Sequence, residues 1–156
     1  MKVGILGGGQ LGQMLAQAAK PLELETVVLD PAEDAVAGQV TRHLAADWTD
    51  PAALQELAAT DVVTYEFENV PAEVVEKLVA DVPVHPAPEA LVKSGDRIIE
   101  KNLFRELGIE TAPFAQVDSR EDLDRAVAEI GLPAILKTRR FGYDGKGQVV
   151  LRSAAD

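Results

Sequence analysis

The sequence predicts an α/β protein in which a doubly wound parallel sheet is followed by a second, smaller unit of helices and strands. Three observations predict this fold class. Short apolar runs alternate with amphipathic segments over the first 90 residues, a glycine-rich turn follows the first run, and a proline-rich stretch interrupts the alternation near residue 90. Strand and helix in strict alternation are typical of a parallel sheet.

The first unit is expected to alternate strands with helices as far as the proline-rich stretch. Asp50 is a candidate N-cap with Pro51 at the first helical position, and Pro71 opens the following helix. The run VPVHP is expected to form a short last strand. The expected strands are 2–6, 26–29, 40–44, 62–65 and 82–86, and the expected helices begin at residues 10, 51 and 71.

The second unit is expected to begin at about residue 90, which gives domains 1–90 and 91–156. A helix that starts near residues 94–96 should end at Gly108, and a strand is expected at 114–117. Ser119 and Asp122 form a capping box for another helix, which Gly131 stops. Two further strands, AILKT and QVVLR, flank the loop RRFGYDGKG.

Composition narrows the classes of function. The formal net charge of −11 disfavours general binding to nucleic acid or to an anionic membrane surface. The chain has no cysteine, which excludes disulfides, a thiol nucleophile and a cysteine zinc site. No segment resembles a membrane span or a secretion signal, so we expect a cytoplasmic protein.

The opening stretch VGILGGGQLGQML carries the spacing G-x-G-x-x-G at Gly7, Gly9 and Gly12. A turn with little side chain lets backbone amides and a helix N-terminus approach an anion closely, and the spacing leaves the anion open. Asp30 stands where a dinucleotide-binding protein has the acid that binds the ribose. A domain of an NAD(P)-dependent oxidoreductase is therefore an alternative interpretation.

A second glycine-rich loop lies in a region of opposite charge. Between residues 131 and 152 there are five cations and one acid, in a chain whose acids outnumber its bases by eleven. Gly142, Gly145 and Gly147 free the backbone to surround an oxygen-rich ligand, and Lys137 supplies a fixed charge. Gly147 follows "GK" where a Walker A loop needs serine or threonine, so the P-loop interpretation fails. The alternative is a hairpin tip with solvated charges.

This loop, KTRRFGYDGKGQ, resembles the lid of an ATP-grasp enzyme. Together with GGGQLGQML, YEFENVP and DRIIEKNLF it resembles the N5-carboxyaminoimidazole ribonucleotide synthase family of purine biosynthesis, over all 156 residues and in order. The resemblance implies a Rossmann-like preATP-grasp domain followed by the beginning of an ATP-grasp α+β subdomain. The formate-dependent glycinamide ribonucleotide transformylases share the opening loop, but usually have glutamate where Gln10 stands and lack GYDG.

The resemblance also implies a set of binding residues. The opening loop would hold the ribonucleotide, with its amides on the 5′-phosphate. Glu66 and Glu68 share a strand face by the two-residue period, and at least one of them, preferably Glu68, would meet the ribose hydroxyls or the amine. Lys137, Asp144 and Lys146 would be catalytic. The implied ATP contacts are Arg97, Lys137, Gly142, Tyr143, Asp144, Gly145, Lys146, Gly147 and Gln148, and the implied substrate contacts are Gly7, Gly8, Gly9, Gln10, Leu11, Gly12, Glu66, Glu68 and Tyr143.

The implied activity is ATP-dependent carboxylation of 5-aminoimidazole ribonucleotide with bicarbonate through carboxyphosphate, with magnesium on the nucleotide and no biotin. Members of the family continue past the position of Asp156, where the magnesium ligands are expected, so no metal ligand is expected here and the chain is expected to be an N-terminal fragment with negligible activity alone. The resemblance is compatible with a homodimer of the whole enzyme. A noncatalytic ribonucleotide-binding module is the other alternative.

Overall fold

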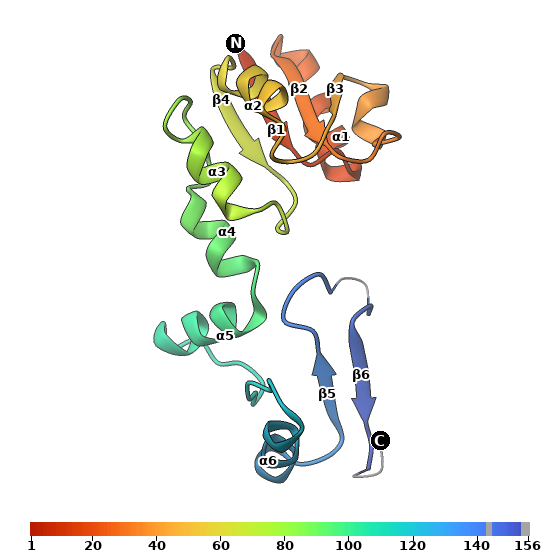
Figure 1. The fold of residues 1–156 in the computed structure, drawn as a ribbon, viewed down its shortest axis with the longest axis vertical. Helices are drawn as coiled ribbons and strands as arrows, with labels where there is room; N and C mark the ends of the chain where they lie inside the picture. The colour runs from red at the N-terminus through yellow and green to blue at the C-terminus, as the bar shows by residue number, and fades with distance from the viewer. Residues whose placement is uncertain (143–144, 154–156) are drawn as a thin grey trace. The chain divides into compact units, whose positions relative to one another are not determined.

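The computed structural model describes residues 1–142 and 145–153, and the chain divides into two compact units, Met1–Val92 and Lys93–Asp156. The first unit is built on a four-stranded parallel sheet of order β3-β2-β1-β4 (Figure 1). Its strands are β1 (Lys2–Leu6), β2 (Glu25–Asp30), β3 (Arg42–Ala45) and β4 (Val62–Tyr65). Because β2 and β4 both pair with β1, the direction of winding changes between β1 and β4, and this is where open α/β sheets bind ligands.

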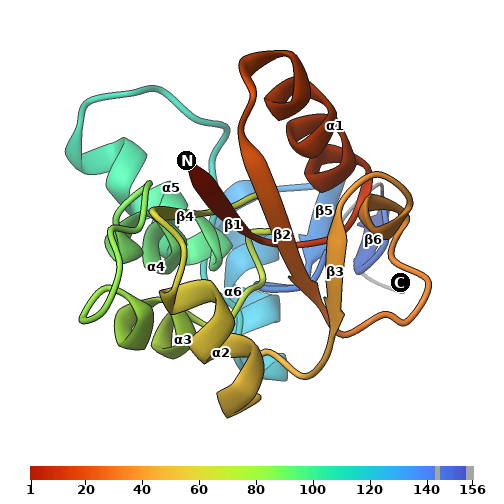
Figure 2. The ribbon, with the colours of Figure 1, turned by 90° about the horizontal axis from the view of Figure 1, so that it is seen from above.

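Helices cover both faces of this sheet, which confirms the predicted doubly wound class (Figure 2). Leu6, Leu29 and Val63 belong to the main buried cluster, whereas Ile5 and Val28 belong to a second one, as the two-residue period of a strand requires. The helical elements of this unit are α1 (Gln10–Ala19), α2 (Pro51–Ala58), α3 (Ala72–Leu78) and the short 3-10 helices η1 (Lys20–Leu22) and η2 (Val36–Gln39), and α4 (Pro88–Ser94) runs across the boundary between the units.

The expected local signals at the helix ends of the first unit are present. The Asp50 side chain accepts a hydrogen bond of 2.8 Å from the Ala53 amide and so caps α2, as predicted. Gly9, the N-cap of α1, has no side chain to offer. The cap of α1 must come from elsewhere in the chain.

The expected strand at residues 82–86 is wrong. Val84 makes only an isolated parallel bridge to Val63, whose amide donates to the Pro83 carbonyl and whose carbonyl accepts from the His85 amide. Pro83 and Pro86 have no N–H to extend this pairing into a ladder. Helix α4 lies outside the expected elements, because the prolines before it indicate only a domain boundary near residue 90.

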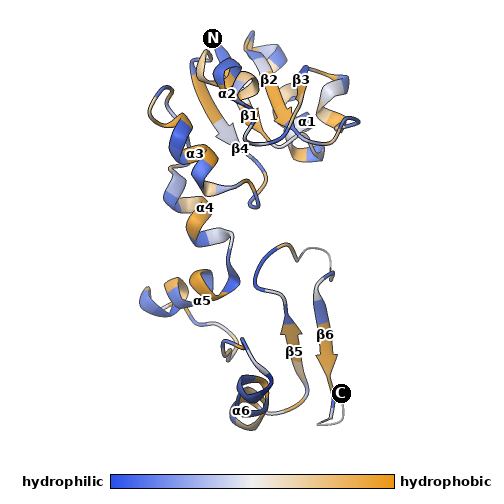
Figure 3. Cartoon of the chain, in the orientation of Figure 1, coloured by the Kyte–Doolittle hydropathy of each residue, from blue (hydrophilic) through white to orange (hydrophobic). Residues whose placement is uncertain are grey.

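The second unit contains α5 (Arg97–Glu106), α6 (Arg120–Ile130) and an antiparallel pair, β5 (Ala134–Lys137) and β6 (Gln148–Leu151). The two strands are hydrophobic along most of their length (Figure 3). Ser119 caps α6 by accepting from the Asp122 amide at 3.1 Å, as predicted. The expected strand at 114–117 is wrong, because in the described part of the chain β5 pairs only with β6 and no strand is left to pair with this segment.

None of the helices that the structure describes is long and apolar enough to cross a membrane.

Candidate functional site

The residues predicted to bind ATP gather around one small cavity in the second unit. Its lining consists of Arg97, Lys137, Gly142, Gly145, Lys146, Gly147 and Gln148, which are all the predicted ATP contacts that the structure describes. Tyr143 and Asp144, which complete the predicted set, lie outside the described residues. The cavity has a volume of about 40 Å³, which is too small for a nucleotide, and Lys137, Gly147 and Gln148 also line a neighbouring cavity of about 730 Å³.

Secondary structure and turn geometry bring these residues together. Lys137 ends β5 directly opposite Gln148, which begins β6. The Thr138 amide donates to the Gly147 carbonyl at 2.8 Å and closes the loop. Gly147 has φ +67°, and a Cβ there would lie 2.5 Å from the Thr138 hydroxyl oxygen, so only glycine fits.

Arg97 reaches the same loop from the first turn of α5. Its Nη2 donates to the Gly142 carbonyl at 3.2 Å. With Lys137 and Lys146 it gives the cavity three cationic lining residues, and none of the described lining residues is acidic. Exposed backbone amides and fixed cations of this kind bind phosphate groups well.

The opening glycine loop of the first unit lies at the carboxyl end of β1, but several of its amides are already engaged, including Gly7 N–H, which donates to the Leu29 carbonyl at 3.0 Å. Gly8 N–H donates to Asp30 Oδ2 at 2.7 Å, and Gly9 N–H donates to Glu66 Oε1 at 3.2 Å. A phosphate could use these amides only by displacing a carboxylate. The expectation that the loop holds a 5′-phosphate therefore stays a prediction, and for Gly8 and Gly9 it requires that these hydrogen bonds be exchanged.

Glu66 supplies the missing cap of α1. Burial raises the pKa of this half-buried carboxyl above its usual 4.5, and the negative charges of Asp30 and Glu68 add to the rise, whereas hydrogen bonds from Gly9 and Gly12 oppose it. The position of Glu66 beyond the end of β4 could not be anticipated from the two-residue period of a strand.

Glu66 and Glu68 do not share a strand face as expected, because β4 ends at Tyr65. Glu68 is exposed and accepts a hydrogen bond of 3.1 Å from the Asn69 side chain. The two remaining predicted substrate contacts, Gln10 and Leu11, begin α1 and are exposed.

Both carboxylate oxygens of Asp30, the residue expected to bind a dinucleotide ribose, already accept backbone hydrogen bonds. Its Oδ2 accepts from Gly8 and its Oδ1 accepts from the Ala32 amide at 2.8 Å. Both oxygens therefore shape the loop, and this use of Asp30 disfavours the NAD(P) interpretation.

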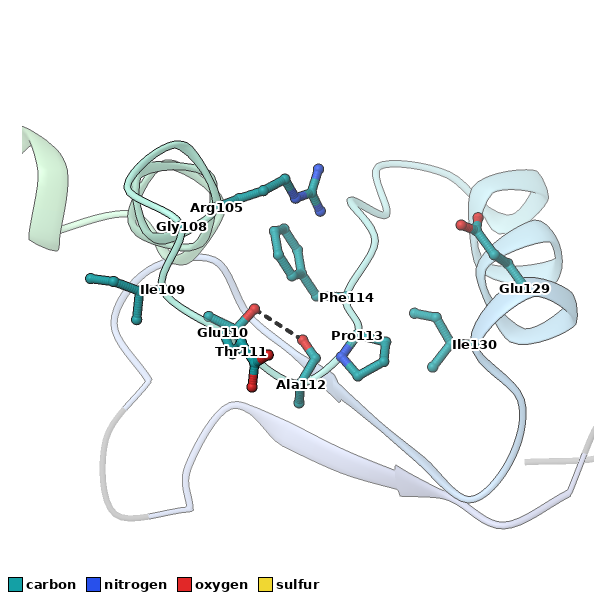
Figure 4. Close-up of a pocket in the computed structure, with 10 residues that line it drawn as sticks. All are labelled: Arg105, Gly108, Ile109, Glu110, Thr111, Ala112, Pro113, Phe114, Glu129 and Ile130. Atoms are coloured by element: carbon teal, nitrogen blue, oxygen red, sulfur yellow. Dashed lines mark hydrogen bonds between the residues drawn. The ribbon is translucent and has the colours of Figure 1, made fainter.

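A larger cavity of about 480 Å³ lies elsewhere in the second unit, where the Arg105 guanidinium stacks over the Phe114 ring at 4.4 Å (Figure 4). It holds none of the residues predicted to bind ligands. Within the described ranges, no group of three or more histidine, aspartate or glutamate side chains is placed to hold a metal ion.

The structure thus defines a class of protein in which an α/β unit on a parallel sheet is followed by a second unit with a cationic, glycine-rich hairpin. Residues 1–94 match the family described as the ribonucleotide synthetase preATP-grasp domain, and residues 102–156 match the ATP-grasp domain. The chain belongs to the ribonucleotide synthetase preATP-grasp family.

The relatives that the chain resembles include N5-carboxyaminoimidazole ribonucleotide synthases. The chain is 55% identical to the N5-carboxyaminoimidazole ribonucleotide synthase of Pseudomonas aeruginosa over 100% of this chain and 44% of the relative. It also resembles the Staphylococcus aureus N5-carboxyaminoimidazole synthetase complexed with ADP, with a TM-score of 0.94, 39% identity, and coverage of 99% of this chain and 42% of that one. The Aspergillus clavatus synthase in complex with ADP and 5-aminoimidazole ribonucleotide gives a TM-score of 0.83 and 30% identity, over 97% of this chain and 40% of that one. The chain thus spans less than half the length of these relatives.

Proposed function

We propose that this chain serves the ATP-dependent carboxylation of 5-aminoimidazole ribonucleotide with bicarbonate, as part of an ATP-grasp ligase that makes N5-carboxyaminoimidazole ribonucleotide. The observation that carries the proposal is the cavity that joins Arg97, Lys137 and Lys146 to the glycine-rich loop. The identity with the Pseudomonas aeruginosa synthase over the whole chain supports it. We assign the ribonucleotide to residues 1–90 and ATP to residues 91–156, and the division of the chain after Val92 supports that assignment.

In the proposed reaction an oxygen of bicarbonate attacks the γ-phosphorus of ATP, the bond to ADP breaks, and carboxyphosphate forms. Carboxyphosphate releases carbon dioxide and phosphate, and the amine of the ribonucleotide attacks the carbon dioxide and loses a proton. Phosphoryl transfer depends mainly on positioning and on neutralising charge. Lys137, Lys146 and Arg97 supply that charge, and the loop amides between Gly142 and Gly147 hold phosphate oxygens.

Asp144 and Tyr143 keep their proposed roles as a catalytic residue and a ligand contact, on the family resemblance alone. The magnesium ion expected with ATP finds no ligand cluster within residues 1–142 and 145–153, so we assign it to no residue of this chain. Bicarbonate is the proposed carbon source, and a homodimer of the whole enzyme is compatible with the proposal.

On the ribonucleotide side, we assign different tasks to the two glutamates. Glu66 shapes the opening loop through Gly9, and its carboxylate is committed to that contact. Glu68 is exposed next to the loop and is our proposed acceptor for the ribose hydroxyls or the amine. Gln10 and Leu11, exposed at the start of α1, complete the substrate contacts together with the glycines of the loop.

Calorimetry with ATP, 5-aminoimidazole ribonucleotide and NADH tests the proposal. Lys137→Ala should abolish ATP binding and leave ribonucleotide binding unchanged. Gly9→Val should abolish ribonucleotide binding and leave ATP binding unchanged. A Cβ at Gly9 would lie 3.2 Å from the Glu66 carboxylate, and the larger valine side chain would displace that carboxylate. Equal loss of both ligands in either variant, or binding of NADH, contradicts the division of tasks.

A further inference from the structure

Asp96 is the one charged residue that is buried among those the structure describes, with 6% of its surface exposed. A buried carboxylate is strongly unfavourable unless it is paired and hydrogen-bonded. Arg139 satisfies it in a bidentate manner: Nε lies 3.0 Å from Oδ2 and 3.2 Å from Oδ1, and Nη2 lies 2.7 Å from Oδ2. Asp96 Oδ1 also caps α5 by accepting from the Ile98 and Ile99 amides.

This pair joins two segments that both contribute to the cationic cavity. Asp96 directly precedes Arg97, and Arg139 follows Lys137 by two residues. Between the same segments the Arg97 amide donates to the Arg139 carbonyl at 3.0 Å, and the Arg97 side chain donates to the Gly142 carbonyl. The first turn of α5 is therefore fastened to the glycine-rich loop by side-chain and backbone bonds in adjacent positions.

We propose that Asp96 and Arg139 are positioning residues for the nucleotide site: their ion pair holds Arg97 at the rim of the cavity without touching the nucleotide. The inference rests on the proposed function of the cavity. Arg139 is committed to Asp96 and has Asp118 3.6 Å from its Nη1, so its charge is neutralised locally. It acts on phosphate only through the placement of Arg97.

The electrostatics of Asp96 agree with a permanently charged pair. Burial alone would raise the pKa of this carboxyl, but hydrogen bonds from the Arg139 guanidinium and from two backbone amides outweigh it and hold the pKa below its usual 3.8. The carboxylate therefore stays ionised at neutral pH, and the fastening does not depend on physiological changes in pH.

The competing explanation is an ion pair that only stabilises the fold. Such a pair would change the free energy of unfolding but not the ATP affinity of the folded protein. Asp96→Asn and Arg139→Gln distinguish a positioning role from a purely stabilising one. Each variant removes one charge of the ion pair, and asparagine at position 96 still caps α5. Arg140→Gln is the matched control: it removes the same charge from the neighbouring position, where the side chain lies over the Phe141 ring instead.

Two measurements on the whole chain test the proposal: hydrogen exchange of the Arg97 amide without ligand, and calorimetry with ATP and magnesium chloride. We expect Asp96→Asn and Arg139→Gln each to speed exchange at Arg97 and to weaken ATP binding by about tenfold to a hundredfold, the range for a misplaced contact. Arg140→Gln should change the exchange rate at Arg97 and the ATP affinity by less than about twofold. The double variant Asp96→Asn/Arg139→Gln should bind ATP no more weakly than either single variant, since the two substitutions disrupt the same ion pair. Arg139→Lys, which keeps the charge, should recover part of the affinity and guards against loss of the fold.

Unchanged exchange and ATP affinity in Asp96→Asn and Arg139→Gln would overturn the positioning role. An equal loss of affinity in Arg140→Gln would also overturn it, because the total charge of the loop would then be the cause. Failure of the unaltered chain to bind ATP would instead refute the proposed nucleotide site, and the exchange measurement would still decide whether the pair holds Arg97.

Discussion

Gly12→Ala tests whether the opening loop is held by close contact between α1 and the turn before it. A Cβ at Gly12 would lie 2.3 Å from the Gly7 carbonyl oxygen, about 1 Å closer than ordinary van der Waals contact. The obstacle is backbone, which cannot rotate away as a side chain can. The helix or the loop must therefore move.

Two opposing effects set the size of the change. Alanine is favoured over glycine inside a helix by about 1 kcal/mol. Overpacking of a close contact costs about 1–3 kcal/mol, and contact with a fixed carbonyl belongs at the upper end of that range. We expect the clash to win and the free energy of unfolding of the first unit to fall by about 1–2 kcal/mol.

Urea unfolding followed by fluorescence measures this change in the right unit. Trp48 is the only tryptophan of the chain, packs against the main core of the first unit and stacks on Phe67. Gln17→Ala, at an exposed position of the same helix, is the control and should change stability by less than about 0.5 kcal/mol. A Gly12→Ala protein as stable as the unaltered chain would refute the reasoning, since α1 would then be free to move away from Gly7.

Three more predictions use the same fluorescence assay. Leu57→Ala, at a side chain with no exposed surface, should lower the free energy of unfolding by about 2–5 kcal/mol, and a loss under 1 kcal/mol would mean that the core collapses around the gap. Asp50→Ala should cost about 1 kcal/mol and Asp50→Asn much less, because asparagine still caps α2, and equal losses would argue against the cap. Glu66 has a raised pKa in the folded state, so its stabilising effect is complete below about pH 4.5 and is lost as the pH rises through the folded pKa. Glu66→Gln should therefore gain stability relative to the unaltered chain as the pH rises above about 4.5, and a pH-independent difference would show that burial does not govern this carboxyl.

The strands and helices that follow local rules were predictable from the sequence. The strand at residues 62–65 has the predicted bounds, and Asp50 with Pro51 fixed the start of α2, because apolar runs and helix caps are decided within a few residues. The prediction of a strand at 114–117 was wrong because a strand also needs a pairing strand, which the apolar residues of this segment do not specify. The contact of Glu66 with Gly9 was not predictable for a similar reason, since the two residues are 57 positions apart in the sequence.

The candidate nucleotide site was predictable in its composition but not in its construction. The reversed charge around Lys137 and the glycines that follow it are visible in the sequence, and the family resemblance added Arg97. The pairing of Asp96 with Arg139 spans 43 residues and carries no local pattern beyond an acid at a helix start. Ion pairs between residues so far apart in the sequence can be identified only in the folded structure, because sequence spacing does not reveal which of several cationic side chains pairs with a given carboxylate.

The single bridge at Val84 has a consequence for how the protein behaves in concentrated solution. Without this bridge, the N–H and C=O groups of Val63 would be unpaired at the outer edge of β4. Unpaired groups at a sheet edge can pair with an extended segment of another molecule, which leads to aggregation. The segment from Pro83 to Pro86 occupies those groups through the Pro83 carbonyl and the His85 amide, and Pro86, which has no N–H, limits further pairing beyond Val84. A substitution that restores an amide donor there, such as Pro86→Val, would favour strand pairing at this edge and fibre formation.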